Sequence, residues 1–278
     1  MRSRSVLNAL IAIALLAEFI ALTGHALFGW GPSPKLVVAT PRPLVYAAAV
    51  PPSGSEMLAE LADTAARQPA QHPTARTPYA YVMRTSWHLP AHVSRGSPIH
   101  PTQTQTWVRA DGAGRLISAT RSARGWVIRD TTIPAGPPRP VLSADPAVLE
   151  RTLDADGSPP APPARVFQAF AELTSAEPVP PSVQAAALRL LALIPGVSNS
   201  GTVIDRDGRP GVAVSLSSDY TGALIRYTLI FDPATGRLLE ADQTVLGEGD
   251  RLPVQEGAVI GYTTFISSGY TANTMTRP

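Results

Sequence analysis

Residues 224–246, Leu-Ile-Arg-Tyr-Thr-Leu-Ile-Phe-Asp-Pro-Ala-Thr-Gly-Arg-Leu-Leu-Glu-Ala-Asp-Gln-Thr-Val-Leu, decide the fold class of this chain. From Ile225 to Phe231, every second residue is large and apolar, which is the period-two pattern of a strand. Asp232-Pro233-Ala234-Thr235-Gly236 then has the order of residue types found in tight turns. A second strand is predicted from Leu238 to Leu246. Because parallel strands need long crossover connections, this short turn predicts an antiparallel hairpin.

Similar strands and turns are predicted on both sides of this hairpin. Asp111-Gly112-Ala113-Gly114 predicts a hairpin turn. Asp205-Arg206-Asp207-Gly208 predicts another, and not a calcium loop, because it lacks the third ligand position and the downstream glutamate of such a loop. The other predicted strand segments are 79–84, 104–110, 115–120, 125–132, 212–216 and 258–266, and Val203 and Ile204 lead to the turn at Asp207-Gly208.

Helices are predicted before and between the two groups of strands. Ser53 and Glu56 form a capping box that begins a helix ending near Arg67. Asp145 followed by Pro146 begins the next helix. The central predicted helices are 145–153, 164–174 and 181–194. We therefore predict an α+β domain over residues 54–278: a curved antiparallel sheet of about seven strands, with a helical insert covering one face.

The N-terminal segment predicts attachment to a membrane. Residues 6–28 are almost entirely apolar and long enough, at 1.5 Å per residue, to cross a hydrocarbon core of about 30 Å. Arg2 and Arg4 precede the run, and the positive-inside rule places residues 1–5 in the cytoplasm. Residues 29–53 are rich in proline and predict a stalk. The domain is then extracytoplasmic, in a single-pass protein of the cell membrane.

An alternative reading makes the same segment a cleaved signal peptide. Gly24-His25-Ala26 has small residues at the spacing of a signal-peptidase site. Cleavage after Ala26 would give a secreted protein, with the domain again outside the cell.

Composition excludes several classes of function. The chain has no cysteine, which excludes disulfides, thiolate zinc sites, a cysteine nucleophile and an acylated lipobox cysteine. Its formal net charge is only +2, and no basic stripe with interleaved aromatics is present, so nucleic acid is not an expected partner.

No catalytic motif is recognisable, so we predict no catalytic residue, no cofactor and no enzyme activity. The sequence lacks a G-x-S-x-G elbow, a P-loop and a G-x-G-x-x-G turn. Glu240 and Asp242 would share a strand face, as acid–base carboxylates could, but the favoured interpretation is a pair of exposed strand residues. His88, His92 and His100 could bind a metal together. Pro90 argues against a helix there, so a flexible loop without metal is preferred.

Aromatic residues concentrate in the first group of strands, and two readings stay open. Tyr79, Tyr81, Trp107 and Trp126 could line an apolar groove for a lipid or peptide. Core packing of these residues, together with Trp87, is the favoured alternative, because strands are enriched in aromatics in any case.

Three blocks of sequence, residues 186–197, 207–214 and 229–239, together resemble an actinobacterial family of single-pass membrane proteins of unknown function. Members of that family are often encoded beside extracytoplasmic-function sigma factors. They usually have a longer cytoplasmic stretch before the membrane helix, whereas five residues precede Val6 here. The resemblance therefore implies no direct anti-sigma role and carries over no catalytic residue. The order of sheet and helices is also similar, more loosely, to the half-barrel of periplasmic lipoprotein carriers.

These observations predict a membrane-anchored, non-enzymatic protein of the cell envelope that binds a partner protein or senses a ligand. The alternative is a carrier or binder of lipid, or of another apolar ligand, on the concave face of the sheet.

Overall fold

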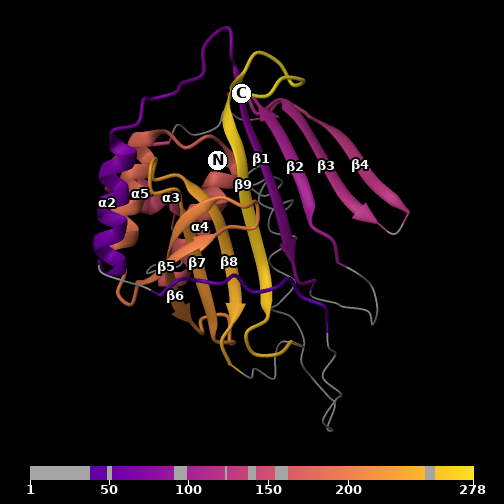
Figure 1. Ribbon diagram of the computed structural model, residues 1–278. Coiled ribbons are helices and arrows are strands. Elements are labelled where there is room, and N and C mark those ends of the chain that lie inside the picture. The colour runs from indigo at the N-terminus through magenta and orange to yellow at the C-terminus, as the bar shows by residue number, and fades with distance from the viewer. Residues whose placement is uncertain are drawn as a thin grey trace, which may run out of the picture.

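The computed structural model describes residues 38–48, 52–90, 99–122, 124–136, 142–153, 162–247 and 254–278. These residues form an α+β domain built on one open antiparallel sheet, as Figure 1 shows. The strand order is β4-β3-β2-β1-β9-β8-β7-β6-β5. The strands are β1 (Tyr79–His88), β2 (Thr102–Val108), β3 (Gly114–Ser122), β4 (Gly125–Ile133), β5 (Ser198–Ile204), β6 (Pro210–Ser218), β7 (Ile225–Phe231), β8 (Leu238–Val245) and β9 (Val259–Thr271).

The predicted hairpin of residues 224–246 is confirmed as β7 and β8. The side chain of Asp232 closes the turn by accepting hydrogen bonds from the Ala234 amide at 2.9 Å and the Thr235 hydroxyl at 2.6 Å. Gly236 ends the turn with a positive φ of 70°, a conformation that favours glycine. The turns at Asp111 and Asp205 are confirmed in the same way, between β2 and β3 and between β5 and β6.

The described sheet has nine strands, where the sequence predicted about seven. Much of the difference lies in β5, which begins with Ser198-Asn199-Ser200-Gly201 and so lacks an alternating apolar pattern. This edge strand forms through backbone pairing to β6, with a bulge between Asn199 and Gly201.

The described helices lie close to their predicted bounds and are α2 (Gly54–Ala66), α3 (Pro146–Leu153), α4 (Pro163–Ala176) and α5 (Pro181–Ala192). The capping box of Ser53 and Glu56 is present at the start of α2. α4 and α5 each begin with a proline, whose missing N–H costs nothing at this position. Leu193 follows α5 as its C-cap, and Gly196 comes just after it with a positive φ of 85°.

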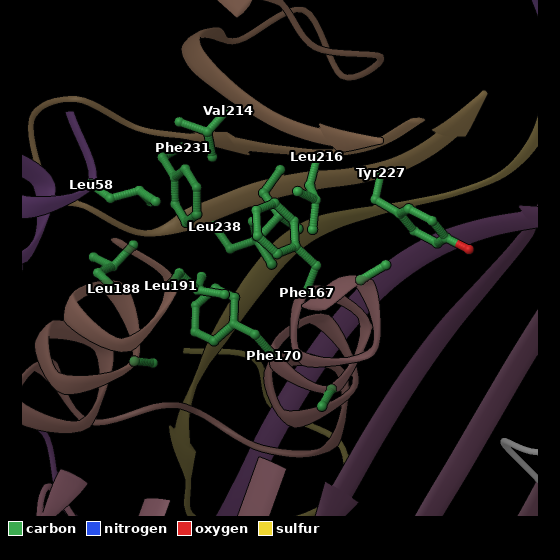
Figure 2. Close-up of a cluster of buried hydrophobic side chains, with 14 of the residues drawn as sticks. Leu58, Phe167, Phe170, Leu188, Leu191, Val214, Leu216, Tyr227, Phe231 and Leu238 are labelled. Atoms are coloured by element: carbon green, nitrogen blue, oxygen red, sulfur yellow. The ribbon is translucent and has the colours of Figure 1, made fainter. Parts of the chain in front are cut away.

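The main hydrophobic core lies between the helices and one face of β6 to β9, which we call the helix-covered face (Figure 2). Phe167 and Phe170 of α4 pack into this core, where Phe170 meets Phe231 with ring centroids 6.2 Å apart. In Figure 1 the helices gather over this part of the sheet, while β2 to β4 extend away from them. The part of the sheet under the helices is therefore a packed layer, whereas β4, at the far edge, is largely exposed.

Part of the predicted stalk lies against the sheet. Tyr46 forms an isolated antiparallel bridge with Val203, and the Ala47 amide donates to the Thr202 carbonyl at 2.8 Å. Leu44 and Tyr46 pack on a small apolar cluster on the face of the sheet opposite the helices. Residues 38–48 therefore belong to the folded domain, although their prolines predicted a free linker.

The predicted membrane segment, residues 6–28, lies outside the described residues, as do the short cytoplasmic end and residue Ala26 of the alternative cleavage site. Within the described ranges, none of the helices is both long enough and apolar enough to span a membrane.

Candidate functional site

A cavity of about 330 Å³ lies between α4 and the helix-covered face of the sheet. Its volume falls in the lower part of the range known for small-molecule sites. The walls are mostly apolar and include Leu153 of α3, Phe167, Ala171 and Leu173 of α4, and Leu229 of β7. The polar residues that line it come from the sheet, α3 and α4, and include Arg84, His88, Tyr227, Asp242, Gln243, Arg165, Gln168 and Glu172.

Tyr227 places a buried hydroxyl in this cavity. Its side chain is only 3% exposed, and in Figure 2 it lies at the edge of the hydrophobic cluster, with its hydroxyl pointing away from the other labelled residues. The hydroxyl makes no hydrogen bond of normal geometry with any residue that the structure describes, and the side chains of Tyr220 and Thr221 are its polar neighbours. Burial is the largest cause that raises the pKa of Tyr227, so the phenol stays protonated and able to donate. An unpaired buried hydroxyl costs about 1–3 kcal/mol, which a ligand acceptor would recover.

Arg84 and His88 form the wall of the cavity contributed by β1. They lie four residues apart on one strand and therefore share a face. The imidazole of His88 covers the backbone of its cross-strand partner Gly261, where even a methyl group would come within 2.8 Å of the ring nitrogen Nδ1. Burial, and then the nearby charge of Arg84, lower the pKa of His88 to about 4. The imidazole is therefore neutral at physiological pH, and Arg84 is the cation of this wall.

Arg165 and Glu172 line the opposite wall, on α4. The two side chains form a paired contact with nitrogen–oxygen distances of 3.1 and 3.2 Å. Because the pair carries no net charge, it makes this wall of the cavity polar without making it positive or negative.

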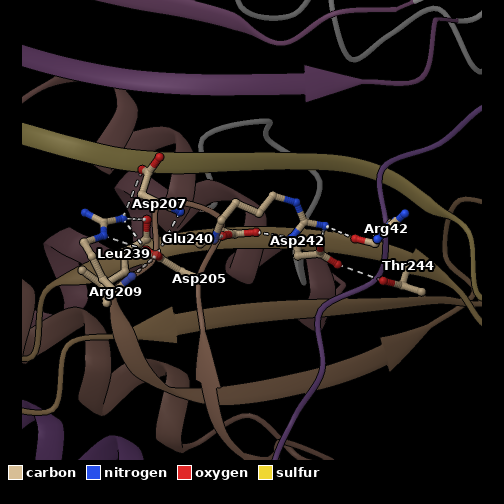
Figure 3. Close-up of polar contacts among 9 residues, drawn as sticks. Arg42, Asp205, Asp207, Arg209, Leu239, Glu240, Asp242 and Thr244 are labelled. Carbon is tan, nitrogen blue, oxygen red and sulfur yellow. Dashed lines mark hydrogen bonds and ion pairs between the residues drawn. The ribbon is translucent and has the colours of Figure 1, made fainter.

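A second group of polar residues lies on the opposite face of the sheet (Figure 3). Arg206, in the turn between β5 and β6, donates to Glu240 at 2.7 Å and to Asp242 at 2.9 Å. The sequence predicted that the two carboxylates share a face, which is confirmed. It also favoured exposed positions, which is wrong, because Glu240 is 0% and Asp242 is 3% exposed.

Burial dominates the protonation of this pair. It raises the pKa of Glu240 to about 7, against the lowering effect of Arg206, and it raises the pKa of Asp242 as well. Arg209 joins the neighbouring Asp205 through its Nε at 2.7 Å and also binds the Leu239 carbonyl at 3.0 Å. All these acids are bound by arginines. We therefore interpret the cluster as a structural contact that joins the turn to β8, and not as a reaction centre.

The four aromatic residues of the predicted groove are separated by the structure. Tyr81 and Trp107 are buried side by side, with ring centroids 5.0 Å apart. The C-terminal residues cover them, since the indole of Trp107 donates to the Thr276 carbonyl at 2.8 Å. Tyr79, on the same strand, is half-buried, whereas Trp126 on β4 is 64% exposed.

The sheet register explains this separation. Trp107 is opposite Arg115 on β3, while Trp126 is opposite Arg121, six residues further along the same strand. At about 3.3 Å per residue, these positions are roughly 20 Å apart. Tyr81 and Trp107 thus follow the core interpretation, and Trp126 does not join them.

The predicted histidine loop is also divided. His88 belongs to strand β1 and borders the cavity, His100 precedes β2, and His92 lies outside the described residues. Among the described residues, no group of three or more acids and histidines is placed to hold a metal ion. Sequence reasoning missed the cavity because its polar residues come from elements far apart in the chain, namely β1, β7, β8, β9, α3 and α4. The only local signal was the placement of Arg84 and His88 four residues apart, and therefore on one face, of strand β1.

Comparisons with known proteins leave the family open. No family model and no curated protein matches the chain. Among solved structures, the dehydratase domain of the CurK module of curacin polyketide synthase is 11% identical, with a TM-score of 0.16, over 69% of this chain and 75% of that one. The dehydratase domain of the CurF module is 12% identical, with a TM-score of 0.15, over 69% and 76%. Similarities this low carry no argument about fold or function.

Proposed function

We propose that this chain is a non-enzymatic ligand-binding protein whose cavity beneath α4 holds a mostly apolar molecule with one hydrogen-bonding group. It is held on the outer side of a membrane by residues 6–28, as the sequence predicts. The observation that carries the proposal is the buried hydroxyl of Tyr227, which makes no hydrogen bond of normal geometry with a described residue, on a residue that lines a mostly apolar cavity of about 330 Å³. Buried polar groups are nearly always paired, so an acceptor on a ligand is the simplest partner.

The cavity supports the ligand-binding alternative more than partner binding. Protein partners dock on exposed surface, whereas this cavity is recessed between α4 on one side and four strands on the other. Its location also differs from the aromatic groove predicted from the sequence, because it faces the helices. A lipid-like or other apolar ligand remains the expected class.

Filling the cavity tests the proposal. In the full-length chain held in amphipol, we expect a dansylated undecanoic acid to bind with increased fluorescence. Ala171 lines the cavity, and Ala171→Trp should weaken this binding at least tenfold by occupying the space. Ala66 is exposed at the end of α2, so Ala66→Trp is the matched control and should bind like the wild type. Equal binding by Ala171→Trp and wild type, with both folded, would refute the proposal.

Tyr227→Phe tests the polar contact separately. Removing a hydroxyl that pairs with a ligand should weaken binding about fivefold to thirtyfold, because a buried hydrogen bond is lost. If the hydroxyl had no role in binding, the variant would bind the probe as tightly as the wild type and would be more stable when empty.

Binding of an envelope protein is a second candidate, favoured by the exposed edge strand β4. Trp126 is 64% and Ile128 66% exposed there, and the outer edge of β4 has no neighbouring strand in the described sheet. A photo-crosslinking residue at Ile128 should capture a partner in intact cells. The same residue at Leu193, which is 77% exposed beyond α5, should not. Equal crosslinking at the two positions would argue against this candidate.

A further inference from the structure

A second cavity, of about 220 Å³, lies on the same side of the sheet, past the C-terminal end of α4. Its walls come from the segment that follows α2, the proline-rich connection between α4 and α5, and strand β9. The residues that line it are Ala65, Gln68, Pro69, Gln71, Val82, Thr174, Pro178, Val179, Pro180, Pro181, Gln184, Thr235, Arg237, Leu238, Phe265, Ser267, Ser268 and Tyr270. The proposed function does not involve this cavity.

Among the described residues that line this cavity, Arg237 is the only charged one. Its Nη2 donates to the Ser268 hydroxyl at 3.0 Å, and no carboxylate of a described residue forms a salt bridge with it. A guanidinium has five N–H donors, so most of its capacity remains for another acceptor. Burial, and then the charge of Arg209, lower the pKa of Arg237, whereas the charge of Asp232 raises it, and the residue is exposed to solvent. Its surroundings therefore favour the arrival of a negative charge.

The position of Arg237 is set by hydrogen bonds beneath it. The amide of Gln184, in α5, donates to the Gly236 carbonyl at 2.8 Å, and that of Gln68 donates to the Ala234 carbonyl at 3.3 Å. Two side chains thus hold the turn that precedes Arg237. An arginine on a fixed turn loses little freedom when it binds, which increases affinity.

The rest of the lining is neutral and mixed. Hydroxyl groups of Thr235, Ser267 and Ser268 and the amide of Gln71 line the cavity beside apolar surfaces such as Phe265. A lining that combines hydroxyl groups with apolar surface matches a sugar-like ring, which has polar edges and apolar faces. One guanidinium with no acidic neighbour in the lining balances one negative charge, and guanidinium and carboxylate pair in a planar two-bond geometry.

We propose that this second cavity binds a small hydroxylated carboxylate, of the sugar-acid type, with its carboxylate on Arg237. Phosphate is disfavoured, because its second negative charge would have no partner in the lining. The site is independent of the apolar cavity, so either proposal can fail alone.

The test is a titration of the full-length chain in amphipol with D-glucuronate, followed by calorimetry or by saturation-transfer NMR. We expect saturable binding that D-glucose, which lacks the carboxylate, shows at least tenfold more weakly. Arg237→Gln should weaken glucuronate binding at least tenfold, and Arg237→Lys should restore part of it. Arg121→Gln, at an exposed position on β3, is the matched control and should bind like the wild type.

Three outcomes would overturn the proposal: absence of saturable glucuronate binding, equal binding by Arg237→Gln, or equal binding of glucose or inorganic phosphate. The dansyl probe gives the fold check, because Arg237 lies outside the first cavity and its variants should still bind that probe. If Arg237→Gln loses both ligands, Arg237→Lys decides: recovery of probe binding without any recovery of glucuronate binding refutes the site.

Discussion

The guanidinium of Arg206 lies 4.4 Å from the ring centroid of Tyr262, directly over the face of the aromatic ring. The same guanidinium binds Glu240 and Asp242 on the neighbouring strand. One side chain from a turn therefore joins β8 and β9 through two charge pairs and one cation–π contact.

Arg206→Met should destabilise the domain strongly. Methionine keeps most of the length but leaves two buried carboxylates without their cation, and breaking such a pair costs about 3–5 kcal/mol. Urea unfolding of the full-length chain measures the loss. Arg189→Met is the control, because its pair with Asp63 is exposed and should contribute less than about 1 kcal/mol. Similar losses in both variants would contradict the structural role of Arg206.

Glu240→Gln should change how stability depends on pH. The folded-state pKa of Glu240 is raised from 4.5 to about 7, so folding favours its protonated form. Its contribution is fully present below about pH 4.5 and is lost as the pH rises through 7. Relative to Glu240→Gln, the wild type should lose up to about 3 kcal/mol over that window. Parallel pH profiles for the two proteins would contradict this prediction.

His88→Gln should reveal a pH dependence of stability in the opposite direction, because His88 stabilises the fold at high pH and not at low pH. The pKa of His88 is lowered from 6.5 to about 4 by burial and by Arg84, so folding favours the neutral imidazole. Its contribution is present above pH 6.5 and is lost as the pH falls through 4. The wild type should lose about 1–3 kcal/mol relative to His88→Gln over this range. The effects of His88 and Glu240 on stability occur over overlapping pH ranges. The two single variants and the double variant must therefore all be measured.

Gly236→Ala and Gly208→Ala form a matched pair. Both glycines have positive φ, 70° and 81°, so alanine is strained at each by about 1 kcal/mol. At Gly236 a methyl group would also come within 2.6 Å of the Leu61 carbonyl oxygen of α2, whereas at Gly208 nothing lies within 4 Å. We expect Gly236→Ala to cost at least about 2 kcal/mol more, measured by urea unfolding. Equal losses of stability in the two variants would show that α2 does not pack closely enough against this turn to exclude a methyl group.

Deleting residues 274–278 should expose Trp107. The deletion removes the Thr276 carbonyl, which accepts from the indole, and the Thr274 carbonyl, which accepts from Arg115 at 3.0 Å. In a variant with Trp107 as the only tryptophan, its emission should shift to the red, and acrylamide should quench it more strongly. An unchanged spectrum would mean that other parts of the chain bury this ring.

The limits of sequence reasoning follow from the reach of each interaction. Ser53 pairs with Glu56 three residues away, and Asp232 with Thr235 at the same separation, so the sequence shows both partners together. Arg206 and Glu240 are 34 residues apart, and Trp107 and Thr276 are 169 apart, so no local pattern joins them. The exposed reading of Glu240 was wrong for this reason, because strand alternation gives the face of a residue but not what covers that face.

The sequence by itself determined the antiparallel hairpins, the helix bounds and the turn residues of this protein. These features depend on backbone preferences and on hydrogen bonds between residues close in sequence, so a short stretch of sequence contains all the residues involved. Only the tertiary structure decided where the cavities lie, which aromatic residues are buried, and how residues 38–48 pack. Each of those features is made by segments distant in the chain, whose contacts arise only when the sheet and its helices close over a shared core.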